Sequence, residues 1–301
     1  MKQRFKFLTL AVALMAGLTM TSCLGDSGDP VDGRFGVIAK VYSSYFTTFR
    51  TPGVDPITIT PTEASINSIV TNNPDFSMSN LNGRIVSIGY SWNPELIQFP
   101  ADTKEYDGVS LISIESLDEA TLVVSAGAVG TENDSVATHP IISLNPQVNG
   151  YTYKPYFFDN NRTEIIVPVQ YYVPLNSQAT SFNVSLVYYP DDPDTQADKA
   201  NGILRLHVNY RIHGVEEFST QYKSSDLTYY GMRYYYGMRY FYKAFRLNGN
   251  IERAWGGSLP SAVNLVADEN EFSTKLDDSQ TKHDQVYPVV TYEQYVEDLT
   301  N

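Results

Sequence analysis

The side chains that could carry chemistry are few, and their spacing argues against catalysis and against metal binding. The four histidines are His139, His207, His213 and His283. His207 and His213 fall on one face of a candidate strand but lie roughly 20 Å apart, too far to bind one metal ion. We therefore interpret both as solvated polar residues on the outer face of a sheet. The sequence contains no H-E-x-x-H zinc motif and no G-x-S-x-G nucleophile motif.

An acidic run, PDDPDTQADKANG, follows a candidate strand and contains Asp191, Asp192, Asp194 and Asp198. Carboxylates are ligands for Ca²⁺, but the spacing does not match an EF-hand loop and Pro193 stiffens the segment. A solvated hairpin loop is therefore favoured, with no metal and no cofactor. Any two of the 34 acidic residues could meet in space as a glycosidase pair, and nothing in the sequence selects one. We expect a protein that is not an enzyme, with an unrecognised hydrolase as an alternative.

Residues 229–240 read YYGMRYYYGMRY, one hexamer written twice. Six residues advance an α-helix by about 600°, so the copies would face different ways, whereas on a strand both copies keep the same faces. The repeat therefore predicts a strand, bent or bulged at Gly231 or Gly237. A duplicated strand is the favoured reading, and a platform that stacks on a sugar or a peptide is the alternative. With the two tryptophans, which stand beside turn residues, its stacking candidates are Trp92, Tyr229, Arg233, Tyr235, Arg239 and Trp255.

The N-terminus has the form of a lipoprotein signal. A basic start precedes the apolar run Phe7–Met20, which is too short to span a membrane. Met20-Thr21-Ser22-Cys23 then resembles a lipobox, and Cys23 is the only cysteine of the chain. We predict a signal peptide over residues 1–22, a lipid on Cys23 and a flexible tether over residues 23–33. Two or three acyl chains anchor a protein stably, so the expected location is the cell envelope, at the outer membrane, facing the periplasm or the surface.

The charge of the chain restricts its partners. Without residues 1–22, 18 basic residues remain against 34 acidic ones, a formal charge of −16. This balance argues against nucleic acid as a partner and against attraction to lipid headgroups through charge. The expected partners are the membrane, through the lipid, and a peptide, protein or glycan ligand.

Period-two alternation recurs along the chain and predicts an all-β protein. Strands are expected at residues 35–42, 83–92, 109–117, 120–129, 163–173, 181–189 and within 202–214, with Pro168 at an edge or a bulge. Short helices are expected at 62–70, capped by Thr62, and at 291–299, while 267–285 reads as a polar loop. A turn-rich segment, GAVGTENDSVATHP, separates a domain over residues 34–145 from a second over residues 146–301.

Three stretches resemble a known family: ITPTEASI, the LNGRIVSIGYSW block with the later YDGVSLISIESLDE, and GILRLHVNYRI. With the leader, they are similar to NigD-like lipoproteins of Bacteroidetes, named for a gene in a bacteriocin operon. The resemblance implies a small OB-like barrel followed by an antiparallel β-sandwich, and it brings no catalytic residues. It also suggests a role in bacteriocin immunity. Asp134-Ser135-Val136 resembles the O-glycosylation signal of that phylum, which would place a glycan on Ser135.

From these observations we expect a lipid-anchored binding or structural protein of the envelope, of the immunity type that the family name suggests. The alternatives are a surface glycan-binding lipoprotein that uses its tyrosine and tryptophan faces, and the hydrolase.

Overall fold

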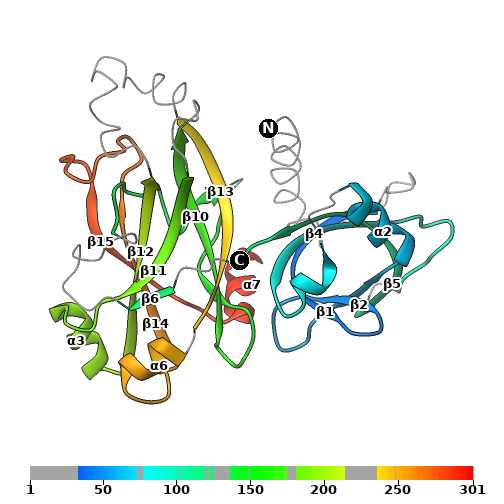
Figure 1. The fold of residues 1–301 in the computed structure, drawn as a ribbon, viewed down its shortest axis with the longest axis horizontal. Coiled ribbons are helices and arrows are strands. Elements are labelled where there is room, and N and C mark those ends of the chain that lie inside the picture. The colour runs from blue at the N-terminus through cyan, green and yellow to red at the C-terminus, as the bar shows by residue number, and fades with distance from the viewer. Residues whose placement is uncertain are drawn as a thin grey trace. The chain divides into compact units, whose positions relative to one another are not determined.

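The computed structural model describes residues 33–72, 77–100, 102–118, 122–124, 136–148, 150–174, 181–213, 236–247 and 249–300. The chain divides into two compact units, residues 1–118 and residues 119–301 (Figure 1). Within the described ranges, no helix has both the length and the apolar character needed to cross a membrane. The predictions made for Cys23, Ser135, Tyr229, Arg233 and Tyr235 lie outside the described residues.

The first unit is a closed five-stranded barrel in the order β1-β2-β3-β5-β4. β3 and β5 pair in parallel, and the other neighbours pair antiparallel. The barrel confirms the predicted OB-like domain. Its elements are β1 (Gly33–Ser43), β2 (Thr47–Arg50), β3 (Thr58–Pro61), α2 (Glu63–Asn72), the 3₁₀ helix η2 (Met78–Leu81), β4 (Ile85–Trp92) and β5 (Glu105–Ser116).

Alternating apolar residues fill the barrel, as the period-two pattern predicts. Thr62 caps α2, as expected, because its Oγ1 accepts a hydrogen bond from the Ser65 N–H at 3.4 Å. The fully buried residues of the barrel core are Ala39, Val41, Phe49, Ile59, Val86, Ile88 and Val109.

Two sheets form the second unit. The three-stranded sheet has the order β13-β10-β9, and the five-stranded sheet has the order β15-β14-β12-β11-β6. Figure 1 shows β10 and β13 lying against the larger sheet. The strands are β6 (Leu122–Val124), β7 (Gln147–Val148), β8 (Tyr151–Thr152), β9 (Tyr156–Phe157), β10 (Glu164–Pro174), β11 (Ser181–Tyr188), β12 (Ile203–His213), β13 (Tyr236–Arg246), β14 (Ala262–Glu269) and β15 (Lys282–Pro288); the helices are α3 (Pro193–Ala200), α6 (Gly249–Trp255) and α7 (Tyr292–Thr300).

One apolar core joins the two sheets, which makes the unit a sandwich. Val167, Val169 and Tyr171 of β10 pack in the same cluster as Leu206 of β12 and Leu265 of β14. All five side chains are buried. Removing this apolar surface from water is the main contribution to the stability of the sandwich.

The larger sheet is mixed, whereas the sequence predicted an antiparallel sandwich. β12 pairs antiparallel with β11 but parallel with β14, and β11 pairs parallel with β6. Parallel neighbours require a crossover connection. Between β12 and β14 the chain passes through β13 of the other sheet and through α6, which returns it to the larger sheet in the same direction.

The division between the units falls at residues 118 and 119, whereas the sequence prediction set it at residues 145 and 146. Residues 138–144 hydrogen-bond within the second unit. The N–H of Thr138 donates to the carbonyl of Tyr210 at 3.0 Å, and that of Ile142 donates to the carbonyl of Gln170 at 2.7 Å.

Pro168 lies where β10 needs no donor. The partner strand β9 ends its pairing at Ile166, and the next bond on that side joins the N–H of Gln170 to the carbonyl of Ser143 at 2.9 Å. Residues 166, 168 and 170 direct their N–H groups to the same side of an antiparallel strand. The missing N–H of Pro168 therefore falls between two pairing segments and costs no ladder bond.

The second copy of the hexamer is part of β13, as its even spacing predicts. Pairing with β10 runs without a register shift from Tyr236 opposite Pro174 to Arg246 opposite Glu164, so Gly237 forms no bulge. The first copy, with Gly231, and Tyr235 at the start of the second copy lie outside the described residues.

Two expected loops contain regular structure. The acidic run holds helix α3 instead of an open hairpin loop, because Asp192 caps it and Pro193 occupies its first turn. Residues 267–285 include the end of β14 and the start of β15, and only the turn between them matches the predicted polar loop. The C-terminal helix was expected and is α7.

Candidate functional site

A cavity of about 180 Å³, lined by both polar and apolar residues, lies on the outer face of the five-stranded sheet. Strand β12 forms its floor, and residues 136–139, the end of β11 and the β14–β15 pair surround it. The lining residues are Val136, Ala137, His139, Tyr189, His207, Val208, Asn209, Val266, Ala267, Asp268, Leu276 and Asp284.

His207 is the central polar side chain of this cavity. It is 6% exposed, and its ring meets the ring of Tyr189 edge-on at a centroid distance of 4.9 Å. Within the part of the chain that the structure describes, its Nε2 has no hydrogen-bond partner. A buried polar atom in this state costs about 1–3 kcal/mol unless a ligand or a water molecule pairs with it.

The surroundings of His207 favour the neutral imidazole. Burial lowers the pKa of His207, and the nearby guanidinium of Arg205 acts in the same direction. The carboxylates of Asp192, Asp284 and Asp268 oppose this shift. A neutral ring has one N–H donor and one nitrogen acceptor, so it can take either role toward a ligand.

His139 is the second buried histidine of the lining. Its backbone N–H donates to the carbonyl of Tyr210 at 3.3 Å, and its Nδ1 lies 2.8 Å from the Oγ1 of Thr138. Burial lowers the pKa of His139 to about 4. Both histidines of the lining are therefore neutral near pH 7.

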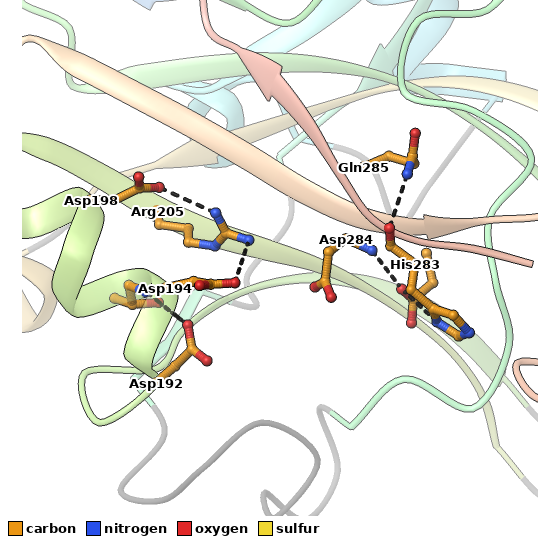
Figure 2. A network of polar contacts seen from close by, with 9 residues as sticks. Asp192, Asp194, Asp198, Arg205, His283, Asp284 and Gln285 are labelled. Carbon is orange, nitrogen blue, oxygen red and sulfur yellow. Dashed lines mark hydrogen bonds and ion pairs between the residues drawn. The ribbon is translucent and has the colours of Figure 1, made fainter.

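The carboxylates of the lining come from a β-bulge between β14 and β15. Asp284 has a φ of 53°, a conformation that aspartate adopts more readily than most residues. Asp268 holds this bulge together, because its Oδ1 accepts bonds from the Asp284 N–H at 3.1 Å and from the Nδ1 of His283 at 3.1 Å (Figure 2). Bulges redirect side chains and occur often beside functional sites.

Helix α3 neutralises a buried cation near the cavity, Arg205. Arg205 of β12 is 7% exposed and makes ion pairs with Asp198 at 3.3 Å and Asp194 at 3.6 Å (Figure 2). Asp192 caps the same helix through a bond from the Thr195 N–H at 2.8 Å. The acidic run thus supplies a helix cap and ion pairs. Among the described residues, no group of three or more His, Cys, Asp or Glu side chains could hold a metal ion.

The described stacking candidates, Trp92, Arg239 and Trp255, are not among the residues that line this cavity. Trp92 belongs to an aromatic cluster of the barrel, stacked on Phe35 at 4.9 Å and edge-on to Phe99 at 5.2 Å. Trp255 packs against the sandwich core in α6, with the Nζ of Lys199 5.1 Å from its ring centroid. Arg239 is in β13, paired with Tyr171, and its side chain lies outside the described set.

The barrel has an exposed aromatic tip that the sequence reasoning missed. In the β1–β2 loop Tyr45 is 98% exposed and Phe46 is 77% exposed, while Arg50 lies over the ring of Tyr42 at 4.9 Å. In OB folds this loop is one of those that bind ligands. None of the polar residues of this loop is buried, so the cavity is the stronger candidate site.

The cavity also escaped the sequence reasoning, which placed His207 on a solvated face. The strand pattern was right: Leu204, Leu206 and Val208 face the core, and His207 and Asn209 face the other way. The opposite face is nevertheless buried, at 6% and 8% exposure for His207 and Asn209. The sequence feature that could have indicated a buried polar site was this row of hydrogen-bonding side chains. The same row is equally typical of a strand face exposed to solvent.

Comparisons with known proteins give relatives of the fold. No protein-family model and no curated protein matches the chain. Similar solved structures include a candidate lipoprotein of Bacteroides fragilis NCTC 9343, with 20% identity and a TM-score of 0.57 over 85% of this chain and 97% of that one. A NigD-like immunity protein of Bacteroides caccae has 10% identity and a TM-score of 0.42 over 82% of this chain and 92% of that one. At 20% identity, the likeness to the candidate lipoprotein is one of fold.

We predict that His139 makes the protein sensitive to acid. Folding lowers the pKa of His139 from 6.5 to about 4. Between these two pH values the His139 ring is therefore protonated in the unfolded chain and neutral in the folded chain. Stability contributed by the neutral ring is therefore lost as the pH falls from 6.5 toward 4. The His139→Gln variant should lose about 2–3 kcal/mol less free energy of unfolding than the wild type between pH 7 and pH 4.5.

Urea unfolding of both proteins at the two pH values measures this difference. The carboxylates are the same in both chains, so their protonation cancels in the comparison. Parallel losses of stability in wild type and variant would contradict the assignment.

Proposed function

We propose that this protein is a lipid-anchored, non-catalytic binding protein of the cell envelope, and that the cavity beside His207 is its binding site. The observation that carries the proposal is the cavity itself, in which the buried polar side chains of His139, His207 and Asn209 line the wall together with Asp268 and Asp284. Ligand sites are typically hollows of this kind, with apolar walls and a few convergent polar groups.

The composition of the lining supports binding over catalysis. Its polar side chains are two histidines, two aspartates, one tyrosine and one asparagine, with no serine, threonine, cysteine or lysine among the described lining residues. The carboxylate of Asp268 accepts a hydrogen bond within the bulge, and Asn209 donates to the hydroxyl of Tyr189 at 2.8 Å. These groups are held in place to receive a ligand, and none is arranged as a nucleophile beside a base.

The envelope location rests on the leader and on Cys23, with support from the fold shared with the candidate lipoprotein of Bacteroides fragilis. The −16 charge of the chain without residues 1–22 leaves the acyl chains as the means of membrane attachment.

Blocking the cavity should abolish ligand binding. In Ala137→Phe the new ring occupies the cavity, whereas Ala197→Phe places the same ring on the exposed side of α3 as a matched control. Full-length protein in non-ionic detergent is screened by thermal shift against amines, amino acids, monosaccharides and short peptides. A ligand at 100 times its Kd adds about 2.7 kcal/mol, which raises the Tm by several degrees.

We expect at least one class to raise the Tm of the wild type and of Ala197→Phe, and to leave that of Ala137→Phe unchanged. If no class stabilises the wild type, or if both variants respond as the wild type does, the cavity is not the binding site.

Acylation of Cys23 is tested separately. Cells fed an alkyne-tagged palmitate should label the wild-type protein and leave Cys23→Ser unlabelled, because the thiol of the only cysteine is the attachment point. The variant should also leave the membrane fraction, since a protein without acyl chains has no comparable anchor. Equal labelling of the two proteins would remove the lipid from the proposal.

A narrower role within this proposal is bacteriocin immunity, supported by the sequence resemblance to NigD-like lipoproteins. The ligand would then be a bacteriocin peptide or its receptor. Deleting the gene should increase the sensitivity of the strain to bacteriocins of neighbouring strains, and the restored wild-type gene should reverse the effect. Unchanged sensitivity to every bacteriocin tested would contradict the immunity role, although the proposal of a binding protein would still stand.

A further inference from the structure

The residue proposed to be acylated and the first strand of the barrel are close in the chain. β1 begins at Gly33, and from Cys23 to Gly33 the chain can extend by at most about 35 Å. Gly33 pairs with Trp92, the last residue of β4, and the β4–β5 loop (residues 93–104) follows directly. This end of the barrel is therefore held near the surface into which the acyl chains would insert.

Two neighbouring loops at this end expose aliphatic side chains. Leu96 of the β4–β5 loop is 81% exposed, and Val54 of the β2–β3 loop (residues 51–57) is 63% exposed. The two loops are joined by an ion pair of 3.0 Å between the Nζ of Lys104 and the Oδ2 of Asp55. We call these two loops the entry face of the barrel. Contact with an apolar phase would remove the aliphatic side chains from water, which is favourable.

Aromatic side chains lie directly beneath the entry face. Trp92 stacks on Phe35 with ring centroids 4.9 Å apart, and Phe99 meets Trp92 edge-on at 5.2 Å. The ring of Tyr106 lies 4.8 Å from that of Phe99. All four side chains are partly exposed. Tryptophan and tyrosine are enriched where a bilayer meets water, because their rings combine an apolar body with a polar group. The composition of this end of the barrel therefore suits such a boundary.

The charge of the entry face indicates the kind of lipid. Its loops carry Asp55, Glu95 and Asp102 against Lys104, a formal charge of 1 − 3 = −2. Anionic headgroups would be repelled by this charge, so the contact must be apolar and the lipid zwitterionic.

The opposite end of the barrel has more exposed aromatic side chains but lies farther from the lipid. Tyr45 and Phe46 follow β1, which spans 11 residues and rises by about 33 Å from Gly33. For this tip to reach the bilayer, the chain between Cys23 and Gly33 would have to be almost fully extended. Such an extended chain is entropically unfavourable, whereas the entry face meets the bilayer without it.

We propose that the entry face rests on a bilayer of zwitterionic phospholipid, with Leu96 and Val54 in contact with its apolar part. This inference rests on the lipid anchor of the proposed function and adds an orientation of the barrel. Two aliphatic side chains bind a bilayer weakly, but a short tether raises their effective concentration at the surface to roughly the millimolar range. The acyl chains anchor the protein, and this contact orients the barrel.

The test uses the acylated protein in phosphatidylcholine vesicles that contain a nitroxide-labelled lipid. The thiol of Cys23 is blocked by the lipid, so a new cysteine is the single site for a thiol-reactive fluorophore. Gln98→Cys places the fluorophore in the β4–β5 loop, and Tyr45→Cys places it at the opposite end; both positions are exposed. We expect about threefold stronger quenching in Gln98→Cys than in Tyr45→Cys, because only the entry face lies at the bilayer.

Two glutamate substitutions test whether the contact depends on the apolar loop. Leu96→Glu, combined with Gln98→Cys, should reduce the quenching about threefold, because a carboxylate is costly to remove from water. Phe46→Glu, combined with the same label, is the matched control at the opposite end and should leave the quenching unchanged. Leu96 and Phe46 are 81% and 77% exposed, so both variants should fold as the wild type does.

Three outcomes overturn the inference. Equal quenching of the two labels, or equal effects of the two glutamate variants, would show that the entry face does not contact the bilayer. Stronger quenching in Tyr45→Cys would assign the contact to the opposite end. Dimers in detergent that Leu96→Glu converts to monomers would make the entry face a contact between two copies of the chain.

Palmitate labelling separates the failure of this inference from the failure of the proposed function. If Cys23 carries no lipid, the anchor and the orientation of the barrel are both rejected. If Cys23 is acylated and the Gln98→Cys label is not preferentially quenched, the inference alone fails.

Discussion

Strand β12 is buried on both of its faces, and the organisation of the second unit follows from this constraint. Leu204 and Leu206 lie in the core between the two sheets, and Arg205, His207 and Asn209 lie beneath other segments on the opposite side. Polar groups removed from water must find partners within the protein, or their burial costs free energy. The segments that cover β12 are therefore the ones that supply such partners.

The cost of burial is offset in a different way for each of these three polar side chains. Arg205 is neutralised by two carboxylates of α3, and Asn209 donates to the hydroxyl of Tyr189. A buried charge without its partner would destabilise the fold by about 3–5 kcal/mol, so α3 is needed where it stands. His207 is neutral and less costly to bury, and it lines the cavity together with Asn209. The candidate site thus arises where the covering segments leave a space.

The segment that covers one side of the cavity also holds the sandwich together. After His139 it pairs with the end of β14 and then with Gln170 of β10, so it bridges the two sheets. Glu269, which is 9% exposed, fixes its far end by accepting bonds from the Leu144 N–H at 2.9 Å and from the Tyr287 hydroxyl at 2.7 Å. Burial raises the pKa of Glu269, and these two bonds oppose the shift. A substitution in the cavity wall near Val136 is therefore close in sequence to the segment that joins the two sheets.

The sequence by itself determined which segments form strands and which faces of those strands are apolar. Alternation placed Leu204, Leu206 and Val208 on one side of β12, and the even hexamer repeat predicted a strand where β13 runs, because side chains of a strand alternate with a period of two. Only the tertiary structure decided what covers the polar face. His207 meets residues 136–139 and the β14–β15 bulge, which are distant in sequence, and periodicity records the direction of a side chain but not what lies there. The parallel pairing of β12 with β14 was likewise hidden, because it depends on a crossover through the other sheet.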